Sequence, residues 1–124
     1  MSFAAVGVGA VLGAWLRWWL GVWLNPVHSH LPLGTIVANL GGGFIIGLSV
    51  AFFNSHPGLA PEWRLMVITG FLGALTTFST FSAESMLLLQ RGDYLWAFGH
   101  SALHLTGSIL CCILGFALYR NLAA

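Results

Sequence analysis

Four apolar segments, each long enough to cross a lipid bilayer, make up nearly all of this chain. They cover about residues 3–24, 33–53, 63–90 and 94–119, and short turns join them. A helix needs ~20 apolar residues to cross the hydrocarbon core of a membrane. Of the 124 residues, 58% are hydrophobic and only 6% are charged, whereas soluble domains carry about 25% charged residues. The sequence therefore predicts an all-α membrane protein with four transmembrane helices in a single domain, residues 1–124.

The first segment is expected to stay in the membrane as a span. It lacks the basic start and the small-residue cleavage pattern of a secretory signal peptide, and its apolar stretch is longer than that of such peptides. The net charge of +1 provides no basic surface for nucleic acid.

The basic residues favour neither orientation in the membrane. With four spans, both termini lie on one side, so Arg64 and Arg120 fall near that side and Arg17 and Arg91 near the other. The chain has no lysine to change this balance. Because an excess of Lys and Arg on one side normally sets the orientation, we predict that the chain inserts both ways and forms an antiparallel, dual-topology homodimer. Glycines in the first two spans allow close helix packing, within one copy or between copies.

The third segment contains the stretch that fits lipid least well. Residues 73–82 read Gly-Ala-Leu-Thr-Thr-Phe-Ser-Thr-Phe-Ser, at the middle of that segment. Lipid offers no partner for a loosened backbone or for clustered hydroxyls, so this stretch belongs against protein or along a watery path. We expect a broken third helix near the bilayer centre, which frees carbonyls such as those of Gly73 and Thr76. A hard cation, which takes oxygen ligands, is one candidate partner, and a neighbouring helix is the other.

Few polar residues lie inside the first two spans, and each has two interpretations. The Arg17 side chain either extends toward the lipid headgroups or draws anions into a vestibule. Asn39 can donate two hydrogen bonds without carrying a charge. Its partner is either a neighbouring helix or a passing anion.

Aromatic and polar side chains follow the suspected break in the third span. Phe78 and Phe81 are three residues apart and share one helical face. Such pairs usually pack, but a phenyl ring has an electropositive edge that can replace part of an anion's hydration shell. Ser79, Thr80 and Glu84 lie around the same turns. Glu84 is the only acid well inside a span, and its possible roles are proton relay, ion-path residue or hydrogen-bonded structural group.

The fourth span carries a polar stripe. His104 and Ser108 are four residues apart on one face, and Cys112 follows one turn later, with His100 one turn before. This stripe either lines a path or packs against the third span. Metal binding is not expected, because no group of ligands has the spacing of a tetrahedral site.

Three stretches resemble signatures of the Fluc/CrcB fluoride channels, which are small four-span bacterial membrane proteins. They lie in the expected order on the first three spans, at residues 13–18 (GAWLRW), 34–42 (GTIVANLGG) and 70–84 (GFLGALTTFSTFSAE). The resemblance covers essentially the whole chain. Two positions depart from the family pattern: Ala74 stands where a second glycine is frequent, and Cys112 stands where some relatives have a hydroxyl residue.

The resemblance implies a passive fluoride channel in the bacterial inner membrane, built as an antiparallel dual-topology homodimer with two pathways. Hydrogen fluoride enters cells as a neutral molecule and ionises inside, and the channel lets fluoride leave, which relieves its toxicity. The resemblance places these residues along the pathway: Asn39, Phe78, Phe81, Ser79, Thr80, Glu84, His104 and Ser108. It makes Arg17 the vestibule arginine. It also implies that the backbone carbonyls of Gly73 and Thr76, from both subunits, hold a central structural sodium ion.

Two other function classes are alternatives. A small dual-topology multidrug or cation exporter resembles this chain in size, but such exporters carry a carboxylate in the first span, where this chain has Arg17 and no acid. A non-transporting membrane assembly subunit explains the glycines and tryptophans but not the hydroxyl-rich third span. An enzyme is not expected, because the chain has no nucleotide-binding loop, nucleophile–base arrangement or hydride-cofactor fingerprint.

Overall fold

The computed structural model describes residues 1–123, and every regular element in this part of the chain is helical. The elements are α1 (Ser2–Leu24), a 3₁₀ turn η1 (Asn25–Val27), α2 (Leu33–Ser55), α3 (Pro61–Arg64), a π-helix η2 (Leu65–Leu72), α4 (Gly73–Leu75), α5 (Phe78–Gln90) and α6 (Tyr94–Ala123). They form four helical stretches that are long and apolar enough to cross a membrane: Ser2–Val27, Leu33–Ser55, Pro61–Gln90 and Tyr94–Ala123. The predicted all-α protein with four spans is confirmed at this level.

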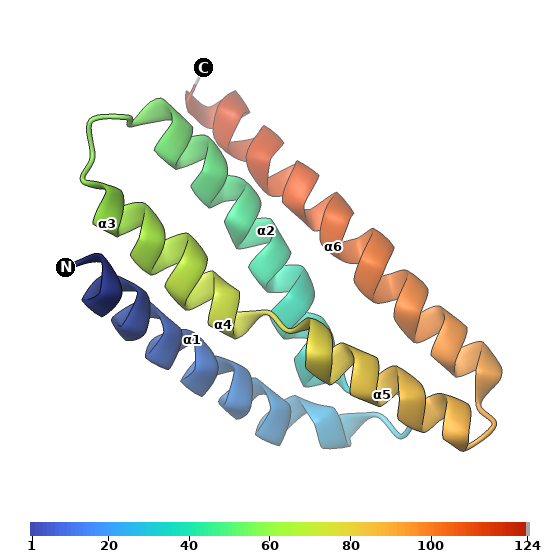
Figure 1. The fold of residues 1–124 in the computed structure, drawn as a ribbon. Coiled ribbons are helices and arrows are strands. Elements are labelled where there is room, and N and C mark those ends of the chain that lie inside the picture. The colour runs from blue at the N-terminus through green and yellow to red at the C-terminus, as the bar shows by residue number, and fades with distance from the viewer. Residues whose placement is uncertain (124) are drawn as a thin grey trace.

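The four stretches run alongside one another, and both ends of the chain lie at the same end of the bundle (Figure 1). The helix α2 packs along α6, while α1 packs along η2 and α4. Beyond α4 the third stretch changes partners, and α5 packs against α6.

Glycines let the neighbouring helices approach closely. A Cβ atom at Gly9 or Gly13 of α1 would overlap the backbone carbonyl of Met66 or Phe71 in η2. A Cβ atom at Gly47 of α2 would likewise overlap the Cys112 carbonyl in α6. Because burial of apolar surface does not drive association in lipid, such close backbone packing is a main source of stability.

The turns carry residues that suit tight reversals. Pro26 lies in η1 directly after α1, and the Asn25 side chain accepts a hydrogen bond from the Thr35 backbone N–H at the start of α2 (3.2 Å). Gly92 has a positive φ of 81° between α5 and α6, which is a conformation that glycine adopts without steric cost. These turns join α1 to α2 and α5 to α6 at the same end of the bundle (Figure 1).

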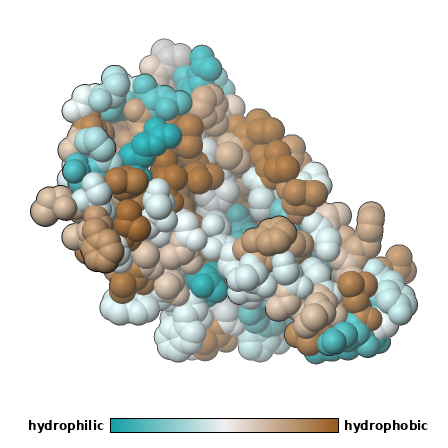
Figure 2. Space-filling view, viewed as in Figure 1, coloured by the Kyte–Doolittle hydropathy of each residue, from teal (hydrophilic) through white to brown (hydrophobic). Residues whose placement is uncertain are grey.

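The outer surface is apolar over most of its length. Large side chains that are exposed on α1 and α6 include Val11, Trp15, Leu105, Ile109 and Ile113. Figure 2 shows strongly hydrophilic residues gathered near the two ends of the molecule, with only small spots between them. A surface of this kind matches contact with lipid, and the buried core is small, centred on Ala38, Leu72 and Leu75.

Candidate functional site: a membrane groove and a buried polar cluster

The third helical stretch changes backbone conformation between α4 and α5. Thr76 (φ −84°, ψ 156°) and Thr77 (φ −152°, ψ 123°) are extended. The Thr77 hydroxyl accepts a hydrogen bond from the Thr80 N–H (3.1 Å), which caps the start of α5. Asn39 of α2 binds the same residue twice: its Oδ1 accepts from the Thr77 N–H (2.7 Å), and its Nδ2 donates to the Thr77 carbonyl (2.9 Å). One asparagine therefore replaces backbone bonds that a continuous helix would make.

Two backbone carbonyls lose their helical donors at this point. In a continuous α-helix the Thr77 N–H would donate to the Gly73 carbonyl, and the Thr80 N–H to the Thr76 carbonyl. Both N–H groups instead bond side chains, as described above. The intervening Ala74 carbonyl accepts from Arg17 Nε (3.0 Å). The carbonyls of Gly73 and Thr76 therefore do not accept a hydrogen bond from the backbone N–H four residues later, as a carbonyl inside an α-helix does.

A groove of about 650 Å³ lies beside this segment. Its lining comes from α2, η2, α4, α5 and α6 and the two extended threonines. Among the lining residues are Asn39, Gly73, Thr76, Phe78, Phe81, His104, Ser108 and Cys112. Most of its other lining is apolar. Two of its polar side chains, Asn39 of α2 and His104 of α6, are hydrogen-bonded to each other.

The two phenylalanines occupy different environments in the groove. Phe78 is 79% exposed, and its ring centroid lies 5.6 Å from that of Phe81. The Phe81 ring packs against the imidazoles of His100 and His104, with centroid distances of 5.3 and 4.7 Å. The pair therefore runs from the open groove to a buried set of polar side chains.

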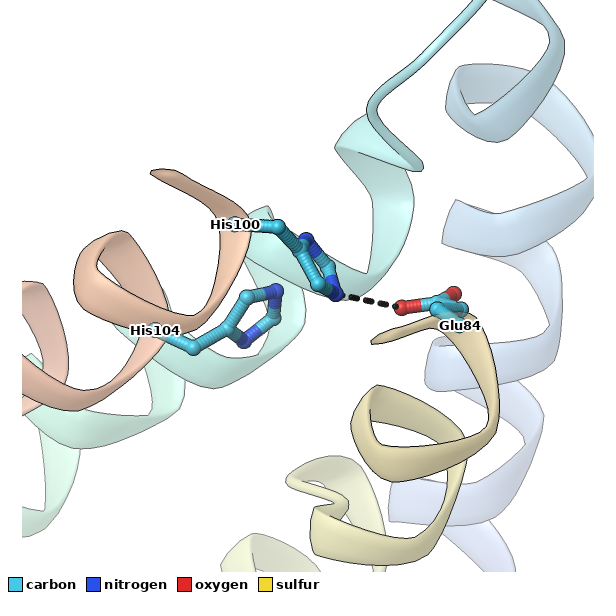
Figure 3. A group of neighbouring side chains, drawn as sticks. All are labelled: Glu84, His100 and His104. Carbon is cyan, nitrogen blue, oxygen red and sulfur yellow. Dashed lines mark ion pairs between the residues drawn. The ribbon is translucent and has the colours of Figure 1, made fainter. Parts of the chain in front are cut away.

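That set comprises the partly buried Glu84 of α5 with the buried His100 and His104 of α6 (Figure 3). His100 is 0% exposed, and its Nε2 lies 3.5 Å from Glu84 Oε1. The second carboxylate oxygen of Glu84 accepts from the Thr35 hydroxyl (2.6 Å), and Asn39 Nδ2 donates to His104 Nδ1 (3.0 Å). A separation of 3.5 Å is too long for a hydrogen bond. We call Glu84, His100 and His104 the polar cluster.

Several atoms of the polar cluster have no hydrogen-bond partner within residues 1–123. They are Glu84 Oε1, both ring nitrogens of His100, and His104 Nε2. The three residues can each offer one metal-ligand atom, and these atoms all lie within 4.8 Å of one another. The polar cluster is thus a group of possible metal ligands, which the expectation that no group has tetrahedral spacing did not foresee. Its members come from two helices, so spacing along one helix could not reveal them.

Two smaller cavities lie away from the groove. One of about 290 Å³ is lined by Arg17, Asn25, Thr35 and Thr80, and it shares Thr77 with the groove. The other, of about 220 Å³, opens beside the 25–32 turn. Residues that line it include His28, His30, Glu84 and Arg91.

The residues singled out from the sequence are thus divided among three places. The groove brings together Asn39, Phe78, Phe81, His104 and Ser108, with Gly73 and Thr76. Thr80 lies with Arg17 in the second cavity, and Glu84 lines the third. Ser79 lines none of these cavities; its hydroxyl lies 3.4 Å from that of Thr77.

Two contacting residues were not among the predicted site residues. Thr35 holds Glu84, and His100 packs between Glu84 and His104. The spacing of His100 and His104, four residues apart on one face, was a signal for the second. Nothing in the sequence indicated that Thr35 meets Glu84, because they are 49 residues apart.

Comparison with known proteins adds a second kind of information. Residues 4–116 match the family model described as CrcB-like protein, Camphor Resistance (CrcB). A relative from Cupriavidus metallidurans is 58% identical over 123 residues, which cover 99% of this chain and 98% of the relative. A relative from Pseudomonas putida is 57% identical over 95% of this chain and 93% of its own length. Both relatives bear the name fluoride-specific ion channel FluC.

Proposed function

This chain belongs to the CrcB-like family, and from that membership we propose that it is a fluoride channel that lets fluoride leave the cell passively. It is a multi-pass membrane protein. It is not an enzyme. The observation that carries the proposal is the 58% identity, over nearly the full length of both chains, to a relative named as a fluoride-specific channel.

The fluoride pathway that we propose follows the groove and the polar cluster. It uses the predicted residues Asn39, Phe78, Phe81, Ser79, Thr80, Glu84, His104 and Ser108, with Arg17 in a vestibule. The electropositive edges of the two phenyl rings replace part of the hydration shell of the fluoride ion. The position of the Phe81 ring beside two buried imidazoles supports this assignment.

Asn39 and His104 have linked roles in this pathway. Both Nδ2 hydrogens of Asn39 are already used, one by the Thr77 carbonyl and one by His104 Nδ1. An anion that binds this amide therefore competes with His104. Because His104 Nδ1 accepts a hydrogen bond, the neutral ring carries its hydrogen on Nε2. That N–H lacks a partner within residues 1–123 and is a donor for an anion.

A structural sodium ion is part of the proposal, held by the carbonyls of Gly73 and Thr76. Both carbonyls have lost their helical donors, and both residues line the groove. Carbonyl oxygens are suitable ligands for a hard cation. One copy offers two such oxygens, so a second copy would have to supply others.

The proposed assembly is an antiparallel, dual-topology homodimer in the bacterial inner membrane. In a single copy, the groove would expose Asn39, Thr76, Thr77 and Ser108 to lipid, which offers no hydrogen bonds. A second copy that covers the groove removes this cost and encloses a path. The balanced distribution of arginines between the two ends of the bundle agrees with insertion in both orientations.

Ion release from liposomes tests the proposed function. The purified protein is placed in vesicles loaded with potassium fluoride and potassium chloride, and a potassium ionophore starts the efflux. We expect rapid fluoride release without an imposed proton gradient, while chloride is retained. A well-folded protein that releases no fluoride, or that requires a proton gradient as an exchanger does, would contradict the proposal.

A further inference from the structure

We propose that Glu84, His100 and His104 form a binding site for a divalent transition-metal ion of the zinc type. Three buried atoms of the polar cluster have no hydrogen-bond partner within residues 1–123: Glu84 Oε1, His100 Nε2 and His104 Nε2. Glu84 Oε1 and His100 Nε2 lie opposite each other at 3.5 Å, and each of the three residues offers a ligand atom within 4.8 Å of the others. Buried polar groups without partners are uncommon and costly. Two histidines and a carboxylate are a ligand set used for zinc.

The distances within the polar cluster suit coordination better than direct hydrogen bonding. Zinc binds imidazole nitrogen and carboxylate oxygen at about 2.0–2.2 Å, so two ligand atoms of a tetrahedral site lie about 3.4 Å apart. His100 Nε2 and Glu84 Oε1 lie 3.5 Å apart, which matches that edge and exceeds a hydrogen-bond distance. His104 offers an atom within 4.8 Å of the other two. A site with all three ligands therefore requires His104 to move closer to Glu84 and His100.

A second layer of contacts already orients the carboxylate. The Thr35 hydroxyl donates to Glu84 Oε2, which leaves Oε1 facing His100. Outer hydrogen bonds of this kind hold ligands in position and strengthen metal sites. The site differs in its chemistry from the carbonyls of Gly73 and Thr76, which offer only oxygen.

Asn39 opposes metal binding by His104. To bind a metal through Nε2, the neutral imidazole must carry its hydrogen on Nδ1, where Asn39 now donates. The two bonds to Thr77 prevent the amide from turning over. An aspartate at position 39 would instead accept from Nδ1–H. We therefore expect Asn39→Asp to tighten zinc binding at least threefold.

One residue of the polar cluster also lines a cavity at one end of the bundle. Glu84 lines the cavity of about 220 Å³ beside the 25–32 turn, together with His28 and His30. On the basis of the proposed function, an ion held by the polar cluster would also block fluoride, because His104 lines the groove and Phe81 packs on both imidazoles.

Direct zinc binding to the full-length, detergent-solubilised protein tests the site. We expect one zinc ion per chain by equilibrium dialysis, and X-ray absorption with two imidazole nitrogens at about 2.0 Å. Glu84→Gln, His100→Gln and His104→Gln should each weaken binding at least tenfold. His56→Gln is the matched control, since His56 is exposed and lies at the other end of α2. Glu84→Gln keeps an acceptor for Thr35, so it remains informative if a histidine variant misfolds.

Two results would overturn the site: no zinc binding by the wild type, or wild-type affinity in a folded variant of the polar cluster. Fluoride efflux measured with and without zinc separates this inference from the proposed function. Efflux that zinc does not inhibit would contradict the blocking role. Zinc binding in a protein that never releases fluoride would contradict the channel and support the metal site.

Discussion

At the scale of single residues, side-chain hydrogen bonds link α2 to α5, to the residue that caps α5 and to α6. Asn39 binds Thr77 and His104, while Thr35 binds Glu84. These bonds cross between helices in a region where lipid would offer no replacement. The side chains of α2 therefore determine the positions of the polar groups on its neighbours.

The bond from Thr35 to Glu84 is expected to stabilise the protein measurably. Thr35→Val keeps the shape of the side chain but leaves Glu84 Oε2 without its donor. A buried acceptor that loses its partner costs roughly 1–3 kcal/mol, and we expect a loss of this size in the free energy of unfolding in mixed micelles. Thr35→Ser, which keeps the hydroxyl, is the control and should stay near wild type. Equal stability of the valine variant would show that this bond contributes nothing.

The Phe81 ring is expected to be needed for fluoride movement. Phe81→Ile removes the ring edge beside His100 and His104 but keeps an apolar side chain. We expect fluoride efflux from liposomes to fall at least tenfold, while size-exclusion chromatography still shows a dimer. Phe78→Ile should act in the same direction. Phe98→Ile changes an exposed phenylalanine of α6 and should conduct normally. Wild-type efflux in both site variants would rule out a role for the ring edges.

At the scale of elements, the backbone contact between α1 and η2 depends on glycine. Gly13→Ala would place a methyl group on the Phe71 carbonyl, whereas Gly7→Ala has no atom within 4 Å of its new methyl. Overpacking of this kind costs about 1–3 kcal/mol. We expect Gly13→Ala to lower the free energy of unfolding by that amount and Gly7→Ala to leave it unchanged. Similar values for the two variants would mean that α1 can move away from η2 freely.

The elements differ in how far the sequence predicted them. Hydrophobicity alone located the four spans, because a long apolar stretch has few alternatives to a membrane helix. The π-helix η2 was not foreseen, since no simple sequence pattern distinguishes it from an α-helix. Groups on one helix, such as His104 and Ser108, could be placed by spacing. Contacts between helices, such as Thr35 with Glu84, depend on crossing positions that periodicity does not give.

At the scale of the whole molecule, the apolar exterior and the balanced arginines raise the question of orientation. Arg64 ends α3 and Arg120 lies in the last turn of α6, whereas Arg17 lies in the second half of α1 and Arg91 directly follows α5. We expect a reporter enzyme fused to the C-terminus to be active on both sides of the membrane. Adding two lysines after Ala124 should bias the chain to one orientation and reduce fluoride efflux. A wild-type fusion found on one side only would contradict dual topology.

The central claim is that this protein conducts fluoride as a channel. Recording current across a planar bilayer that contains the purified protein tests it most directly, with fluoride on one side and chloride on the other. We predict discrete current steps whose reversal potential follows the fluoride gradient and does not shift when the chloride concentration changes. A folded protein that gives no current, or a current that follows chloride, would contradict the account.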